Sequence, residues 1–192
     1  ETQVSDNEPK VFSMISKGNT ESVFQFESQG MGNVQTQHKP DSIEDLIAVV
    51  SLYRPGPMDS IPTYIDCRHN PSHIRYKHPM LKEILEVTYG CIVYQEQVMQ
   101  IFRTLAGYSL GRADIVRRAM SKKKASVMEE ERKNFVYGNE AEGVPGCISR
   151  GISEKVANKI FDDMTDFAKY AFNKSHAAAY AVVSYQTAWL KY

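Results

Sequence analysis

The sequence predicts a mainly α-helical protein with long loops and little or no sheet. Apolar residues recur at spacings of three and four in several stretches, for example at Val98, Phe102 and Leu105, as expected along one face of a helix. Serines stand at the N-cap position before several of these stretches. One short stretch, residues 22–27, alternates apolar and polar residues as a strand does.

The first half of the chain is expected to contain short helices between irregular segments. Residues 1–10 are polar and are expected to form a tail or linker. An amphipathic helix begins at Val11–Ile15 and ends at Gly18, and the glycines of residues 30–33 are expected to loosen the chain after the strand-like stretch 22–27. A further helix, capped by Ser42, ends at Arg54–Pro57, where two prolines and a glycine cannot continue it.

Residues 58–80 are typical of a loop-rich connector with one short helix near Tyr64. Three histidines stand close together there, which raises the alternative of a metal site: His69, His73 and His78. Solvated loop histidines are favoured, because no cysteine or paired acid completes a ligand pattern. No metal site is therefore expected in this chain.

The second half of the chain carries stronger helical patterns. A helix is expected from Met80 to Val87, and another from Tyr94 onward that Gly107 ends. Ser109 is the expected cap of the next helix. The apolar face of that helix comprises Leu110, Ala113, Val116 and Met120.

Two helices and a loop are expected to complete the chain. A charged helix covers residues 125–138, a glycine-rich loop covers 138–151, and a helix capped by Ser153 follows to about Tyr170. Ser175 is the expected cap of the last helix, so that the residues after it form the first helical turn.

The charge of the chain is unevenly distributed, although its net charge is zero. Residues 1–50 hold three lysines and no arginine against eight acids, whereas residues 103–124 hold seven basic residues and one acid. Binding depends on such local patches, so the neutral total does not exclude an anionic partner. The three cysteines form no CxxC pair and indicate the reduced thiols of a cytoplasmic protein. No membrane span or signal peptide is visible.

Arg117 and Arg118 lie in the middle of an expected helix, where the helix dipole gives no reason for two cations. Arginine offers a rigid fork of donors that fits phosphate oxygens, so the pair is interpreted as a phosphate site. The alternative is a surface ion pair with Asp114, the acid nearest in sequence. The lysines that follow are expected to meet a DNA backbone or water: Lys122, Lys123 and Lys124.

A second anion site is expected at the start of the last helix, where free N–H groups and the helix dipole attract negative charge. Lys174 and His176 add positive charge and donors at that point. The alternative is that Ser175 is only a cap and His176 only a surface residue.

Five stretches, in this order along the chain, together resemble the catalytic alpha subunits of bacterial replicative DNA polymerase III, family C. They are FQFESQGM (24–31), RPGPM (54–58), YGCIVYQEQVMQI (89–101), LAGYSLGRADIVRRAM (105–120) and FNKSHAAAYAVVSYQTAWLK (172–191). The resemblance covers nearly the whole chain from about Lys10 onward.

The resemblance implies that residues 11–192 form the helical fingers domain of such an enzyme, with subregions 11–90 near the palm and 91–192 facing the nucleotide. Fingers of this family bind the incoming dNTP and position it with primer–template DNA for template-directed nucleotidyl transfer. Carried over by position, Arg117 and Arg118 contact the triphosphate. The second nucleotide-facing motif comprises Tyr170, Asn173, Lys174 and His176.

Several further expectations follow from the same resemblance. The aspartates that hold two Mg²⁺ ions lie in the palm, upstream of this chain, so the fragment alone is expected to be inactive. Arg54 begins a motif at the border with the palm. Expected partners are dNTP, primer–template DNA, the remaining domains of the subunit and the replicative holoenzyme, with sliding-clamp contacts outside this chain. The chain lacks an initiator Met and stops within a helical pattern, and is interpreted as a piece of a longer protein.

Some roles stay open at this point. His176 acts either as a general acid toward the leaving pyrophosphate or, as favoured, as a plain hydrogen-bond donor to phosphate. Tyr170 either stacks on the nucleobase or packs within the protein. Ser121 and Lys169 stand where family members commonly have glycine, and Lys39 where leucine is expected. Two other functions are carried as alternatives: a non-catalytic helical module that binds nucleic acid, and a helical scaffold for protein interactions.

Overall fold

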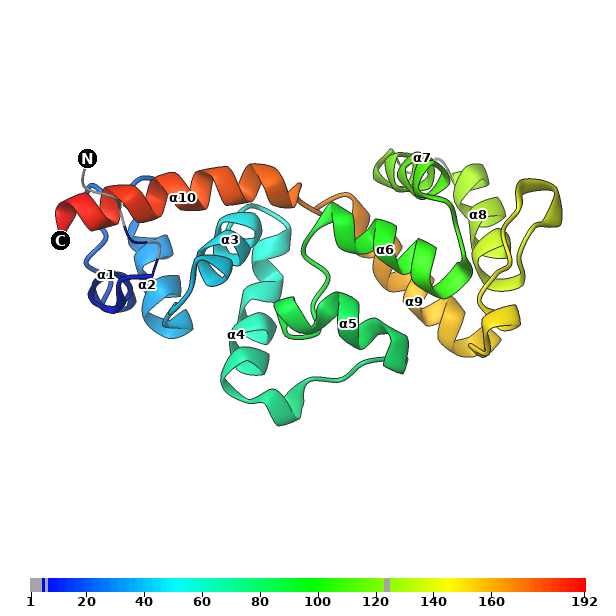
Figure 1. The fold of residues 1–192 in the computed structure, drawn as a ribbon, viewed down its shortest axis with the longest axis horizontal. Helices are drawn as coiled ribbons and strands as arrows, with labels where there is room; N and C mark the ends of the chain where they lie inside the picture. Colours follow the sequence, from blue (N-terminus) through cyan, green and yellow to red (C-terminus); the bar gives the residue numbers. More distant parts are fainter. Residues whose placement is uncertain (1–4, 6, 123–124) are drawn as a thin grey trace. The chain divides into compact units, whose positions relative to one another are not determined.

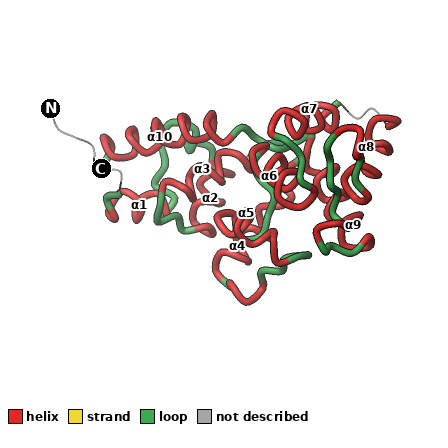
Figure 2. Tube along the Cα trace, turned by 45° about the vertical axis from the view of Figure 1, so that its right-hand side comes forward, coloured by secondary structure: helices red, strands yellow, loops and turns green. Residues whose placement is uncertain are grey.

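The chain folds into α-helices joined by loops and short 3₁₀ turns. The computed structural model describes residues 5, 7–122 and 125–192. Within these residues there are ten α-helices, and the β structure is one isolated bridge between Asn139 and Val144 (Figures 1 and 2). The prediction of a mainly α-helical protein is confirmed. None of the described helices combines the length and apolar character needed to cross a bilayer.

The chain forms two compact units. Unit 1 comprises Glu1–Asn70 together with Phe172–Tyr192, and unit 2 comprises Pro71–Ala171. Unit 1 is therefore built from two segments that are far apart in sequence, whereas unit 2 is one continuous segment.

Unit 1 is organised around its last helix. Its helices are α1 (Pro9–Ser16), α2 (Gln29–His38), α3 (Ile43–Leu52), α4 (Ile61–His69) and α10 (Lys174–Lys191), with a 3₁₀ turn at Pro57–Ser60. Helix α10 packs along α3 and also contacts α1 (Figure 1). Small buried residues line its inner face, namely Ala177, Ala181, Ser184 and Ala188. Because these side chains are short, the two backbones can approach closely.

Unit 2 packs around an aromatic cluster. Its α-helices are α5 (Lys82–Leu85), α6 (Gln95–Ala106), α7 (Leu110–Ser121), α8 (Ala125–Tyr137) and α9 (Glu154–Ala168). Five 3₁₀ turns connect them, at Pro71–His73, Pro79–Leu81, Glu86–Thr88, Glu140–Glu142 and Ile148–Arg150. The ring of Phe102 on α6 lies 5.3 Å from that of Phe135 on α8 and 6.3 Å from that of Phe161 on α9. All three rings are buried, so this cluster holds α6, α8 and α9 together.

The predicted helix starts and stops are confirmed at several places. The hydroxyls of Ser42, Ser109 and Ser153 each accept a backbone N–H in the first turn of the helix they precede. Helix α6 ends at Gly107, whose φ of 77° is disfavoured for other residues. A Cβ at Gly107 would also lie 2.8 Å from the ring of Pro145, so close packing excludes a side chain there.

The strand predicted for residues 22–27 is wrong. Ser22 and Gln25 have positive φ, so the segment coils through tight turns instead of extending. Val23 and Phe26 are both fully buried. Their spacing of three is compatible with turns that point both side chains inward, whereas a strand would point them to opposite faces.

The loosened chain predicted at residues 30–33 is also wrong, because these residues lie inside α2. The hydroxyl of Ser28 caps this helix by accepting the N–H of Met31. Gly30 serves close packing, since a Cβ there would lie 2.1 Å from the hydroxyl of Tyr53. The short helix expected near Tyr64 is present as α4.

Candidate functional site

The residues predicted to face the nucleotide are divided between the two units. Of the predicted dNTP-binding residues, Arg117, Arg118 and Tyr170 belong to unit 2, whereas Asn173, Lys174 and His176 belong to unit 1. Lys122, expected to meet a DNA backbone or water, belongs to unit 2, and Arg54, of the motif at the border with the palm, belongs to unit 1. Lys123 and Lys124 lie outside the described residues.

The two arginines of α7 share one carboxylate. Asp114 Oδ1 accepts hydrogen bonds from Nε (3.2 Å) and Nη2 (2.8 Å) of Arg117. Nη2 of Arg118 lies 2.8 Å from the other oxygen, Oδ2. The arginines are three and four residues after Asp114, which places both beside it on the helix. The ion pair considered as the alternative from sequence is therefore present.

The arginines differ in exposure. The side chain of Arg117 is 16% exposed and that of Arg118 is 68% exposed, so Arg118 projects further from α7. Hydrogen bonds and charge from Arg117, followed by Arg118, lower the pKa of Asp114 below its usual range. The carboxylate is consequently ionised at neutral pH and balances part of the positive charge of the pair.

A buried polar network fixes the first turn of the same helix. Nη2 of Arg112 lies 2.5 Å from Oε1 of Glu131 on α8, and Nη1 of Arg112 pairs with Glu142. The hydroxyl of Tyr108 donates to the other oxygen of Glu131 at 3.1 Å. Burial raises the pKa of Glu131 even though Arg112 opposes the shift. Helix α7 is therefore tied to α8 by charged hydrogen bonds as well as by apolar packing.

Lys122 follows directly after α7. Lys122 is the C-cap residue, and its backbone N–H bonds to the carbonyls of Ala119 and Met120. Lys122 is exposed to solvent. Of the apolar face predicted for α7, Ala113, Val116 and Met120 are buried, whereas Leu110 is exposed.

Asn173, not Ser175, caps α10. Oδ1 of Asn173 accepts the N–H of His176 at 2.8 Å, and the helix begins at Lys174. The prediction of Ser175 as the cap is wrong by two residues because an asparagine stood equally well placed before it. Ser175 is an exposed residue of the first turn. Nζ of Lys174 pairs with the carboxylate of Glu44 on α3 at 3.0 Å.

An aromatic row runs along the start of α10. We define it as Phe172, His176, Tyr180 and Phe24, whose ring centroids follow one another at 5.5, 4.6 and 5.6 Å. His176 and Tyr180 are four residues apart, which places them on one face of α10, and Phe172 lies directly before the N-cap residue Asn173. The guanidinium of Arg54 lies 4.4 Å from the centroid of Phe172, and burial lowers the pKa of Arg54. Sequence analysis assigned no role to Phe24, Phe172 or Tyr180. The spacing of four residues between Phe172, His176 and Tyr180 was nevertheless a signal for stacking.

Comparison with known proteins decides the family. The family model described as the bacterial DNA polymerase III alpha subunit finger domain matches residues 2–143. This chain belongs to that family. The finger domain is 50% identical to the DNA polymerase III subunit alpha of Borreliella burgdorferi over 188 residues, and 50% identical to that of Treponema pallidum over 190 residues. These matches cover 98% and 99% of the chain, and each spans 16% of the relative's length. The subunit of Bacillus subtilis is 46% identical over 190 residues, which are 99% of this chain and 16% of that protein.

Tyr170 of the finger domain lies just after α9. It is half-buried, and its N–H bonds to the carbonyl of Phe167 at 2.9 Å. Nζ of Lys169 lies 4.3 Å from the centroid of its ring, in cation–π contact. Lys169 has αR backbone angles, so a residue other than glycine is accommodated at this position without backbone strain.

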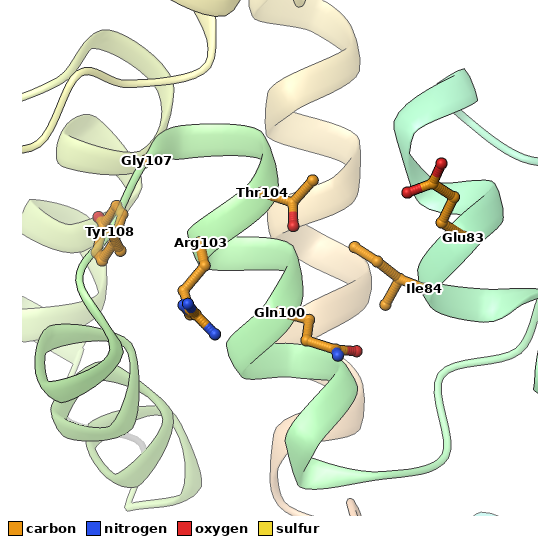
Figure 3. Close-up of a pocket in the computed structure, with 7 residues that line it drawn as sticks. All are labelled: Glu83, Ile84, Gln100, Arg103, Thr104, Gly107 and Tyr108. Atoms are coloured by element: carbon orange, nitrogen blue, oxygen red, sulfur yellow. The ribbon is translucent and has the colours of Figure 1, made fainter.

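A surface pocket of about 420 Å³ lies in unit 2 of the finger domain, beside α6 (Figure 3). Its lining comprises Glu83, Ile84, Gln100, Arg103, Thr104, Gly107 and Tyr108. None of the residues predicted to face the nucleotide is among them. The pocket offers one carboxylate, of Glu83, and one guanidinium, of Arg103, which does not favour a polyanion.

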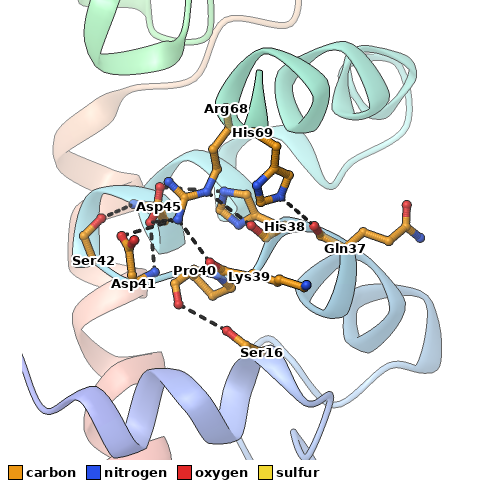
Figure 4. Close-up of polar contacts among 10 residues, drawn as sticks. All are labelled: Ser16, Gln37, His38, Lys39, Pro40, Asp41, Ser42, Asp45, Arg68 and His69. Carbon is orange, nitrogen blue, oxygen red and sulfur yellow. Dashed lines mark hydrogen bonds and ion pairs between the residues drawn. The ribbon is translucent and has the colours of Figure 1, made fainter. Parts of the chain in front are cut away.

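A polar cluster organises the link between α2 and α3 (Figure 4). Arg68 on α4 pairs with Asp41 and with Asp45, at 3.3 and 3.0 Å, and donates to the carbonyls of His38 and Lys39. Burial, followed by the charge of Arg68, lowers the pKa of His38 to about 3. Lys39 has αL backbone angles and an exposed side chain, so Arg68 rather than an apolar residue at position 39 holds this turn.

Two of the histidines expected in the loop-rich connector have structural partners, and one of them, His69, is the last residue of helix α4 and does not lie in a loop. A ring nitrogen of His69 lies 2.9 Å from the carbonyl oxygen of Gln37, and Nδ1 of His78 accepts the N–H of Met80. The described residues contain no group of three or more side chains placed to hold a metal ion.

Proposed function

We propose that this finger domain binds the triphosphate of the incoming dNTP and positions it with primer–template DNA for nucleotidyl transfer by the full-length polymerase subunit. The observation that carries the proposal is the arrangement of Arg117 and Arg118 on α7. Two guanidinium groups are gathered on one carboxylate at the helix surface, within a basic stretch of an otherwise neutral chain. A triphosphate carries several negative charges that must be neutralised and aligned for transfer, and paired guanidiniums suit that task.

The start of α10, in unit 1, is proposed as a further anion-binding element. Asn173 caps α10 through the N–H of His176, and the helix dipole favours an anion at this helix start. Lys174 adds a mobile charge that can exchange Glu44 for a phosphate, because that ion pair is partly exposed. His176 is exposed and acts in this proposal as a hydrogen-bond donor to phosphate, with general-acid catalysis as the further alternative.

The aromatic row offers a surface for the nucleobase. Phe24 is 38% exposed and His176 is exposed, so the row is partly open to solvent and is proposed to contact a base. Base–aromatic stacking is tolerant of sequence, as a polymerase that accepts four nucleotides requires. Tyr170 is assigned a nucleotide-facing role by the same proposal, and Arg54, stacked on Phe172, orients the start of the row.

The chemistry itself is assigned to the rest of the subunit. The proposal gives the two Mg²⁺ ions to palm aspartates outside this chain and to the dNTP. The fragment alone is expected to be inactive. The proposal includes a cytoplasmic location, the remaining domains of the subunit and the replicative holoenzyme as partners, and Lys122, Lys123 and Lys124 as contacts to the DNA backbone.

Steady-state kinetics of the full-length polymerase test the proposal. Arg118→Ala is expected to lower kcat/KM for dNTP by about 30- to 150-fold, since a charged hydrogen bond contributes about 2–3 kcal/mol. Arg103→Ala is the matched control, because Arg103 is an exposed arginine of α6 in the same unit. Equal kinetics for the two variants would exclude Arg118 from the nucleotide site. Loss of DNA affinity with unchanged use of dNTP would favour a non-catalytic nucleic-acid-binding module instead.

A further inference from the structure

Asp114 has a contact pattern that the triphosphate site does not by itself require. One carboxylate accepts from two consecutive arginines, with Arg117 on Oδ1 and Arg118 on Oδ2. Binding of a triphosphate by the two arginines does not require an acid next to them. A carboxylate near a bound anion repels the anion and lowers its affinity, unless the carboxylate also orients the cations that bind it.

We propose that Asp114 is a positioning residue for nucleotide binding: it gathers the guanidinium groups of Arg117 and Arg118 into one fork before the triphosphate arrives. This inference rests on the proposed function of the arginine pair. It assigns to Asp114 no contact with the substrate.

The geometry of α7 explains why the arginines need gathering. Consecutive residues on a helix point about 100° apart, so the two side chains would otherwise diverge. The side chain of Arg118 is 68% exposed, and its ion pair with Asp114 restricts the rotamers that it samples. Ordering such a side chain during binding reduces affinity, and two guanidiniums also repel each other. A single carboxylate placed three and four residues earlier counters both effects.

The contacts leave donors for a ligand. Asp114 takes the Nε and Nη2 groups of Arg117, while Nη1 of Arg117 makes no polar contact within the described part of the chain. A planar guanidinium holds its five N–H groups in a fixed fork, so fixing one edge also aims the other edge. With its lowered pKa, Asp114 is charged at neutral pH and keeps its ion pairs with both arginines.

The exposure of Asp114 at the protein surface makes the inference testable. The side chain of Asp114 is 29% exposed, and surface ion pairs contribute little to folding. Replacing Asp114 is therefore expected to change nucleotide binding without unfolding α7. Asp162→Asn is the matched control, because Asp162 is an exposed carboxylate that pairs with Arg132 at 2.6 Å elsewhere in the same unit.

The experiment uses the full-length polymerase and varies dNTP at saturating primed DNA. Asp114→Ala and the isosteric Asp114→Asn are expected to raise KM for dNTP by about five- to twentyfold with a smaller change in kcat. Asp114→Glu is expected to recover part of the loss, and Asp162→Asn to leave KM unchanged. In an Arg117→Ala/Arg118→Ala background, Asp114→Ala should have no further effect, because a positioning residue acts only through its partners.

The outcomes separate this inference from the proposed function. If Arg118→Ala impairs dNTP use while both Asp114 variants leave KM unchanged or lower it, the positioning role is overturned and the arginine site stands. If Arg118→Ala has no effect, the proposed function fails, and this inference fails with it. An equal effect of Asp114→Ala with and without the arginines would also overturn the inference, since Asp114 would then act by another route.

Discussion

The ion pair between Arg112 and Glu131 offers a prediction about local stability that the structure allows to be worked out. Arg112→Ala removes the guanidinium that lies 2.5 Å from Glu131. The side chain of Glu131 is only 9% exposed, so the variant leaves a nearly buried carboxylate without its Arg112 counter-charge, although the Tyr108 hydroxyl at 3.1 Å and the side chain of Asn134 still hydrogen-bond to it.

The magnitude follows from the burial of the two partners. Removing one partner of a fully buried pair costs about 3–5 kcal/mol. Arg112 is 22% exposed, so water compensates part of the loss and about 2–3 kcal/mol is expected here. At 1.4 kcal/mol per factor of ten, local opening of α7 and α8 should become about 30- to 150-fold more frequent.

Hydrogen exchange of the full-length subunit is the assay, read as protection factors of amides in α7 and α8. Arg112→Ala should lose protection there, while amides of α10 in unit 1 serve as the internal reference. Adding Glu131→Gln should restore most of the protection, because the neutral amide no longer needs a counter-charge. Unchanged protection in Arg112→Ala, or a double variant as unprotected as the single, would refute this account of the network.

The same variant should respond to pH in a definite direction. Burial raises the pKa of Glu131, and Arg112 is the largest influence that lowers it. Without Arg112 the folded-state pKa rises further above the unfolded value of about 4.3. A carboxyl with a raised folded-state pKa stabilises the fold below its unfolded pKa and loses that contribution as pH rises through the folded one. The exchange defect should therefore be largest at neutral pH and shrink under acidic conditions.

Two further predictions concern packing and capping in unit 1. Gly30→Ala should lower the Tm of the subunit by a few degrees, because the new Cβ would lie 2.1 Å from the Tyr53 hydroxyl; Tyr53→Phe should relieve most of this clash, and failure to do so would point to backbone strain instead. Asn173→Ala should cost about 1 kcal/mol of local stability at the start of α10, seen as faster exchange of the His176 amide, whereas Ser175→Ala should leave that amide unchanged.

Where local rules decide the structure, the sequence was sufficient to predict it. Serine caps and the glycine after α6 are set by nearby backbone groups, so Ser109, Ser153 and Gly107 could be assigned without knowing the fold. Helix α2 could not, because its glycines weaken helical propensity and their value lies in contacts with distant residues such as Tyr53. The turns that bury both Val23 and Phe26 are likewise fixed by tertiary packing.

The candidate site was predictable to a similar extent. The residue types of the arginine pair and of the α10 start indicated phosphate binding, and the single acid at Asp114 was visible as an alternative partner. That one carboxylate would hold both arginines depended on rotamers, which the sequence does not specify. The aromatic row joins Phe24 to Tyr180 across more than a hundred residues, so only the folded chain reveals it.

The order in which unit 1 acquires its parts has a consequence for synthesis on the ribosome. The helices α1 to α4 emerge first, but the helix that covers α3 belongs to the final segment, after the whole of Pro71–Ala171. At bacterial translation rates of about 5–20 residues per second, that interval lasts roughly 5–20 s. Unit 2 is continuous and can condense during this time, while the apolar face of α3 stays uncovered. Nascent chains paused before α10 should therefore be good clients for chaperones.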